Sequence, residues 1–251
     1  MRTPKKKMPK QRPQKPKNNS PGRPLGKKLQ LIKSRINNAT IKSGRKPNNI
    51  TIVAVTKAFP PGIWDTALQN QLTTIGESRI QEAENKNKIF TNRKKIELHF
   101  IGHLQGNKTR KAVQLFDVIQ TIDSLKLAKR VNIISKQIKK TQKIFLQVNT
   151  AGDHNKHGLS PDETIEAAAE IVNMMNVSLI GIMTIPPNNI SEKNLQYIYN
   201  KTRIIKEKIQ KTTGKHCNNL SMGMSNDYET AIKEGATHIR LGTALFGERP
   251  Q

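Results

Sequence analysis

Eight short β-like runs alternate with segments of helical periodicity along the 251 residues of this chain. The first run, ITIVAV, consists almost entirely of apolar, mostly branched residues, as in strands that are buried on both faces. The eight runs cover residues 50–55, 72–76, 97–102, 117–122, 143–150, 177–185, 216–222 and 237–242. Eight strands that alternate with helices predict a single (β/α)8 barrel, the TIM barrel fold. A doubly wound open sheet is the alternative, but no G-x-G-x-x-G motif follows any of the runs.

Seven segments before and between these runs have the residue spacing of helices. They cover residues 29–41, 78–90, 107–115, 124–139, 161–175, 191–211 and 226–234. The first of them is an extra helix that precedes the first strand. The clearest helix start belongs to 161–175, where Ser160 is the expected N-cap, Pro161 takes the first position and Glu163 completes a capping box.

Residues 1–27 differ in composition from the rest of the chain. They are rich in lysine, arginine and proline and contain no acidic or aromatic residue, so they cannot bury apolar surface. We predict a disordered basic tail over 1–27 and one folded domain over 28–251. The tail lacks the apolar segment of a secretory signal peptide, and organelle targeting stays open. It could bind nucleic acid or an anionic surface by releasing counterions, but it has no aromatic ring for bases to stack on. A solvated tail without a partner is the alternative.

The charge and the cysteine content narrow the class of protein. The chain carries 44 basic and 18 acidic residues, a formal net charge of +26. Because the part beyond the tail is also basic, it should attract phosphate groups and acidic surfaces. The single cysteine, Cys217, excludes an internal disulfide and fits a reducing compartment, so we predict a cytoplasmic protein. No apolar run approaches the length of a membrane span.

Polar residues follow several of the predicted strands. In barrels of this type, functional residues lie on the loops after the strands' C-terminal ends. Lys57 follows the first strand, Ser78 the second and His103 the third. A lysine at a strand end could extend into solvent, or it could place its amine in a pocket where desolvation lowers its pKa. Because these residues should meet at one rim, the pattern favours a site that includes Lys57.

The most specific chemistry lies near the C-terminus. Ser221, Gly223 and Ser225 precede a predicted helix, and Gly242-Thr243 follows the last predicted strand. Small residues let backbone amides approach an anion, and hydroxyl groups add hydrogen-bond donors. Phosphate sites in these barrels commonly form from the loops after strands seven and eight. A phosphate there and a lysine across the barrel mouth suggest a phosphorylated carbonyl compound held as a Schiff base.

Successive motifs resemble one known family. VAVTKAFP, IGESRIQEAENK, HFIGHLQGNKTR, QVNTAGDHNKHGL, GIMTI and LSMGMSNDYETAIKEGATHIRLGTALFGER occur in this order between about residues 28 and 249. They are similar to the signature blocks of the pyridoxal phosphate homeostasis protein family, also called the proline synthetase co-transcribed homologue family. The resemblance implies a barrel like the N-terminal domain of alanine racemase, without that enzyme's second β-domain. It also implies pyridoxal 5′-phosphate bound as an internal aldimine, with Lys57 in the Schiff-base position.

The same resemblance assigns further cofactor-binding residues. It implies that Ser221, Met222 and Ser225 lie at or near the phosphate, and that Gly242 and Thr243 form the other side of the phosphate site. It places Arg240 against the pyridine nitrogen.

Two stretches depart from the family pattern. Ser78, a further cofactor-site position, replaces the usual asparagine, which puts any ring contact of that amide in doubt. His154 and His157 replace residues that are more often glutamate and serine. Their spacing could seat a metal, but we predict no metal site.

The resemblance bears on catalysis as well. Family members act in vitamin B6 and amino-acid homeostasis without an established catalytic activity. An arginine such as Arg240 can only donate, so the pyridine nitrogen stays unprotonated and the ring is a weak electron sink. Racemisation in the related two-domain enzymes needs a second base, a tyrosine from the missing domain; the tyrosines here are Tyr197, Tyr199 and Tyr228, and the first two fall within a predicted helix.

We therefore predict a non-catalytic binder of pyridoxal phosphate, a monomer, with apo-forms of pyridoxal-phosphate enzymes as candidate partners. Two alternatives stay open. One is a pyridoxal-phosphate-dependent amino-acid racemase or lyase. The other is a nucleic-acid-binding protein that acts through the basic tail.

Overall fold

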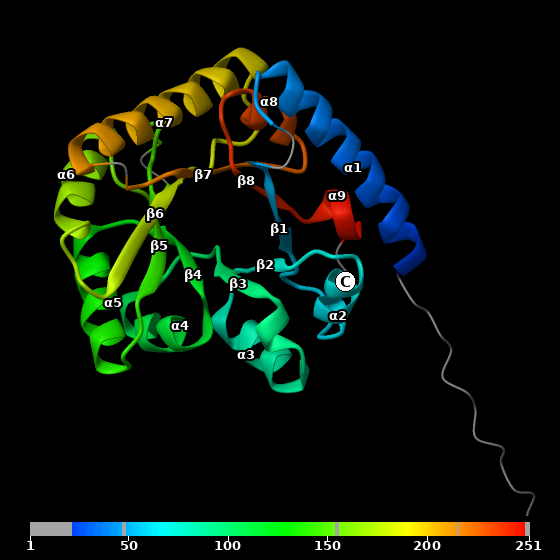
Figure 1. Ribbon diagram of the computed structural model, residues 1–251, viewed down its shortest axis with the longest axis horizontal. Helices are drawn as coiled ribbons and strands as arrows, with labels where there is room; N and C mark the ends of the chain where they lie inside the picture. The colour runs from blue at the N-terminus through cyan, green and yellow to red at the C-terminus, as the bar shows by residue number, and fades with distance from the viewer. Residues whose placement is uncertain (1–21, 47–48, 154–155, 215, 249–251) are drawn as a thin grey trace, which may run out of the picture.

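Eight parallel strands close into a barrel in chain order, from β1 round to β8, which again pairs with β1 (Figure 1). The computed structural model describes residues 22–46, 49–153, 156–214 and 216–248. The strands are β1 (Thr51–Val55), β2 (Thr74–Glu77), β3 (Glu97–Phe100), β4 (Val118–Ile122), β5 (Gln142–Gln147), β6 (Val177–Met183), β7 (Asn219–Met224) and β8 (His238–Leu241). Each overlaps one of the eight predicted runs. The (β/α)8 barrel is confirmed.

Helices surround the barrel on its outside, as Figure 1 shows. They are α1 (Gly22–Lys42), α2 (Ile63–Gln69), α3 (Ile80–Ile89), α4 (Thr109–Leu115), α5 (Leu125–Gln137), α6 (Pro161–Ile171), α7 (Glu192–Thr213), α8 (Tyr228–Lys233) and α9 (Thr243–Phe246), with 3₁₀ turns η2 (Arg93–Lys95) and η3 (Gly106–Lys108). The seven predicted helices are present, and the capping box of Ser160 and Glu163 forms at the start of α6. The short helices α2 and α9 were not predicted.

Helix α1 begins earlier than the sequence predicts. It starts at Gly22, so the domain boundary expected at residue 28 falls inside a helix, and residues 22–27 belong to α1 rather than to a disordered tail. The reason is an apolar stripe at helical spacing that packs along α8 and α9. Its buried members are Leu25, Leu29, Ile32, Ile36 and Ala39. Residues 1–21 of the predicted tail lie outside the described residues.

No helix in the described part of the chain is long and apolar enough to cross a membrane.

Candidate functional site

A cavity of about 670 Å³ opens at the C-terminal ends of β1, β7 and β8. Five of the eight predicted cofactor-site residues line it: Lys57, Ser225, Arg240, Gly242 and Thr243. These residues come from the two ends of the chain, and they meet because β8 pairs with β1 and closes the barrel. The loop after β6 (184–191) contributes further residues to the wall, including Ile185 and Asn188.

Ser221 and Met222, predicted to lie at or near the phosphate, are not among the residues that line this cavity. Both are fully buried. Ser221 points into the barrel: its Oγ donates to Oε1 of Gln120 at 2.6 Å and accepts from the NH1 group of Arg240 at 2.7 Å. Met222, the next residue along β7, packs in the hydrophobic core, as the alternation of side chains along a strand requires.

Ser78 also lies away from the cavity. It borders a second, smaller cavity of about 230 Å³, together with Arg79, His103 and Lys108. Because Ser78 follows β2, its side chain lies on the β2–β3 side of the rim. The structure therefore does not bring Ser78 to the residues predicted to bind the cofactor.

The end of the cavity next to β7 and β8 has the features of an anion site. Ser225 Oγ accepts a hydrogen bond from the backbone N–H of Ala244 at 3.2 Å, which joins the turn after β7 to the start of α9. The β7–β8 register shifts between Ser221 and Met224. Gly223 in this stretch has φ +94°, and a Cβ there would meet the Cβ of Ala231 at 2.6 Å, so the bend needs glycine.

A chain of buried hydrogen bonds through the barrel orients Arg240. His99 contacts Glu97 at 3.1 Å through Nε2 and the Gln120 amide at 2.7 Å through Nδ1. Gln120 then accepts from Ser221, which accepts from Arg240, whose NH2 group donates to the Thr184 carbonyl at 2.8 Å. The hydrogen bond from His99 lowers the pKa of Glu97 to about 2. Because a guanidinium keeps its proton even when buried, Arg240 presents a fixed positive charge to the cavity.

A second buried network holds the backbone on both sides of Lys57. The Lys86 ammonium donates to the Thr56 carbonyl at 2.7 Å, and the Ala58 N–H donates to Oε1 of Glu82 at 2.6 Å. Lys86 also donates to Oε1 of Glu77 and to Oε1 of Glu82, each at 2.7 Å. Ala58 has φ 63°, a conformation that costs free energy in a residue other than glycine. We infer that this network fixes the turn that carries Lys57.

The pairing of Glu77 with Lys86 was missed by sequence analysis. The Lys86 side chain is only 2% exposed and that of Glu77 is fully buried. Burial raises the pKa of Glu77, and the charge and hydrogen bond of Lys86 oppose that rise. The sequence signal was weak: a lysine four residues after a glutamate on a helix normally indicates an exposed pair.

None of the three tyrosines lines the cavity in the part of the chain that the structure describes. Tyr197 is exposed on α7, whereas Tyr199 on α7 and Tyr228 on α8 are buried. Burial strongly raises the pKa of Tyr199.

Fold and site together define a barrel of the alanine racemase type. Residues 29–250 match the family model for the N-terminal domain of alanine racemase. The chain belongs to the pyridoxal phosphate homeostasis protein family: it is 35% identical over 224 residues to the family member of Vibrio alginolyticus, across 88% of this chain and 96% of that protein. The resemblance seen in the sequence is confirmed.

Solved structures agree with this assignment. PipY of Synechococcus elongatus, solved with PLP bound, is 30% identical, with a TM-score of 0.79 over 89% of this chain and 100% of PipY. Alanine racemase of Clostridium difficile, in complex with cycloserine, is 15% identical, with a TM-score of 0.72, and shares the fold. This chain covers only 60% of that racemase.

Proposed function

We propose that this protein binds pyridoxal 5′-phosphate in the cavity at β1, β7 and β8, with Lys57 as a Schiff base, and serves the homeostasis of vitamin B6 and amino acids. One observation carries the proposal: Lys57 and the small residues after β7 and β8 line the same cavity. The family assignment and the ligand of PipY support it. Pyridoxal phosphate supplies an aldehyde for an amine and a ring that withdraws electrons from attached carbon.

The residues present fit such a ligand. Ser225 and the backbone amides of Gly242 and Thr243 offer hydrogen-bond donors to a phosphate, and α9 begins there. Arg240 lines the cavity and offers a donor to a ring nitrogen. Lys57 lines the cavity from β1, where its amine can condense with an aldehyde and release water.

The arrangement favours a carrier or regulator over an enzyme. A donor such as Arg240 favours an unprotonated ring nitrogen, which withdraws electrons weakly. Tyr199 is buried and does not line the cavity, so it is not placed to act as a second base there. The name of the family also points away from catalysis. A racemase or lyase is the alternative, and rapid exchange of the α-proton of bound amino acids with solvent would favour it.

A visible spectrum tests the central proposal. The purified protein with added pyridoxal phosphate should absorb as a Schiff base, and borohydride should convert the adduct to a stable one. Peptide mapping should then locate it on the peptide that contains Lys57. A protein that takes up no pyridoxal phosphate, or that is labelled at many lysines without preference, would contradict the proposal.

The phosphate site has a prediction of its own. Thr243→Val and Ser225→Ala should each weaken pyridoxal phosphate binding by about 1–3 kcal/mol, if each side chain makes a hydrogen bond to a charged group. The binding of free pyridoxal, which lacks the phosphate, should be weakened far less by either substitution. Ser221→Ala is the matched control. It also removes a serine hydroxyl, but this hydroxyl accepts a hydrogen bond from Arg240, so the change should weaken the binding of pyridoxal phosphate and of pyridoxal alike. Equal losses for both ligands in Thr243→Val and Ser225→Ala would place the phosphate elsewhere.

Three further expectations remain predictions: the monomeric state, the apo-enzyme partners and the binding of nucleic acid or anionic surfaces by the tail. A salt titration of nucleic-acid binding before and after removal of residues 1–21 separates the tail from the barrel, because phosphate contacts give a steep salt dependence.

A further inference from the structure

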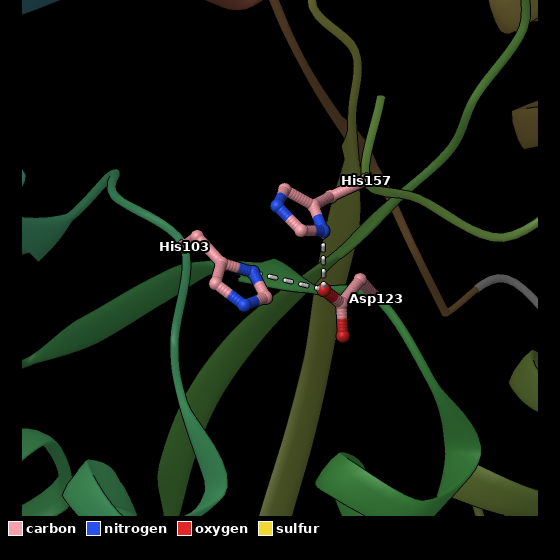
Figure 2. A group of neighbouring side chains, drawn as sticks. All are labelled: His103, Asp123 and His157. Carbon is pink, nitrogen blue, oxygen red and sulfur yellow. Dashed lines mark ion pairs between the residues drawn. The ribbon is translucent and has the colours of Figure 1, made fainter. Parts of the chain in front are cut away.

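Three potential metal ligands converge at the barrel rim, on the loops after three neighbouring strands (Figure 2). His103 follows β3, Asp123 follows β4 and His157 lies in the loop after β5. Oδ2 of Asp123 is 3.2 Å from Nδ1 of His103 and 3.9 Å from Nδ1 of His157. All three ligand atoms lie within 4.8 Å of one another.

The side-by-side pairing of β3, β4 and β5 brings these residues together, not their spacing in the sequence. The sequence pairs His157 with His154, which lies outside the described residues. The structure instead pairs it with two residues that precede it by more than thirty positions. None of the three lines the large cavity. The cluster is thus separate from the residues proposed to bind pyridoxal phosphate, and the inference below does not rest on that function.

The backbone beneath the cluster is anchored. The Gly102 carbonyl, next to His103, accepts from Thr121 Oγ1 at 2.5 Å, which ties the loop after β3 to β4. The His157 carbonyl accepts from the Gln147 amide at 2.8 Å, which ties the loop to the end of β5. Anchored loops with exposed side chains suit a site whose ligands must make only small adjustments.

The side chains need such an adjustment to share an ion. Zinc takes imidazole nitrogen at about 2.0–2.1 Å and carboxylate oxygen at about 2.0–2.2 Å, so the ligand atoms must draw together. The imidazole rings are stacked, with centroids 3.7 Å apart and planes 10° apart. Because each nitrogen lone pair lies in its ring plane, the rings must turn apart to aim at one ion. Both rings can turn, since the His103 and His157 side chains are 43% and 59% exposed.

We propose that His103, Asp123 and His157 form a binding site for a divalent transition-metal ion, with zinc as the expected occupant. Two imidazole nitrogens and one carboxylate favour zinc-like ions over magnesium or calcium, which prefer all-oxygen ligand sets. Three protein ligands leave at least one coordination position for water or a small ligand.

Calorimetric titration with zinc chloride tests the proposal on the full chain, after treatment with EDTA and transfer to a phosphate-free buffer. We expect one ion per chain. Each single substitution of a ligand should weaken zinc binding by more than about tenfold: His103→Ala, Asp123→Asn and His157→Ser. Tenfold is about the smallest loss of metal affinity seen when a residue that only hydrogen-bonds to a metal ligand is changed. His216→Ala, which removes an exposed histidine before β7, should bind zinc as the parent does.

A second measurement reports the ligands directly. Long-range proton–nitrogen NMR spectra of the histidine rings should show zinc-induced shifts at Nδ1 of His103 and His157, with the other histidines unchanged. Circular dichroism checks that each variant is folded. The proposal is overturned if folded variants bind zinc as tightly as the parent, if the parent binds none, or if zinc leaves these two rings unshifted. The cluster would then be only two stacked imidazole rings beside one carboxylate.

Discussion

Lys57→Ala is expected to abolish the covalent pyridoxal phosphate adduct while the barrel stays folded. Lys57 lies in the turn after β1 and borders a cavity, so truncating its side chain opens no void in the core. Without an amine at this position the aldehyde has no partner in the cavity, and the Schiff-base absorption and the borohydride-stable adduct should both disappear. Residual binding through the phosphate site can persist, and equilibrium dialysis would measure it.

Lys108→Ala is the matched control for this experiment. Lys108 also lies on the barrel rim, but it borders the smaller cavity, so its removal should leave both signals intact. A normal yield of adduct at one site in Lys57→Ala would assign the Schiff base to another lysine. Loss of the adduct in both variants would indicate a change in the charge of the rim, not the loss of one amine.

The fold could be predicted because each strand carries its own signal. Buried parallel strands need apolar side chains on both faces, and runs such as ITIVAV (50–55) have them. Helix α9 (Thr243–Phe246) was missed because its 4 residues are too short for a periodic pattern. Helix α2 (Ile63–Gln69) was also missed, although α4 (Thr109–Leu115), which has the same length, was predicted. The start of α1 was placed late because the charge of the first residues outweighed Leu25 as a sign of burial.

The candidate site could be predicted only in part. Lys57 and the Gly242-Thr243 pair were found because a strand end on a barrel rim faces the mouth, whereas Arg240 was placed by the family resemblance alone. Ser221 was predicted at or near the phosphate from its motif, but the alternation of side chains along β7 turns it inward, to Gln120. Contacts between distant segments, such as that between His103 and His157, leave no pattern in one sequence.

The buried network beside Lys57 leads to the largest expected effect on stability. Lys86→Met should destabilise the fold by about 3–5 kcal/mol, the usual loss when one partner of a buried ion pair is removed. Methionine fills nearly the same space, but the Glu77 carboxylate would stay buried without its cation. Oε2 of Glu77 already lacks a hydrogen-bond partner among the described residues. Urea unfolding at pH 7 measures the loss.

The pH dependence of Lys86→Met separates a lost charge from lost packing. Burial already raises the pKa of Glu77, and Lys86 opposes that rise, so in the variant this pKa should rise further. A group whose pKa is higher in the folded state than in the unfolded state stabilises the fold as the pH falls and it takes up a proton. The loss of stability relative to the parent should therefore become smaller as the pH falls from 7 to 5, and adding Glu77→Gln should recover part of that loss at pH 7.

Lys88→Met, at an exposed position on the same helix, is the control and should change stability by less than about 0.5 kcal/mol. A deficit that is independent of pH and survives Glu77→Gln would show that Lys86 contributes packing and not charge.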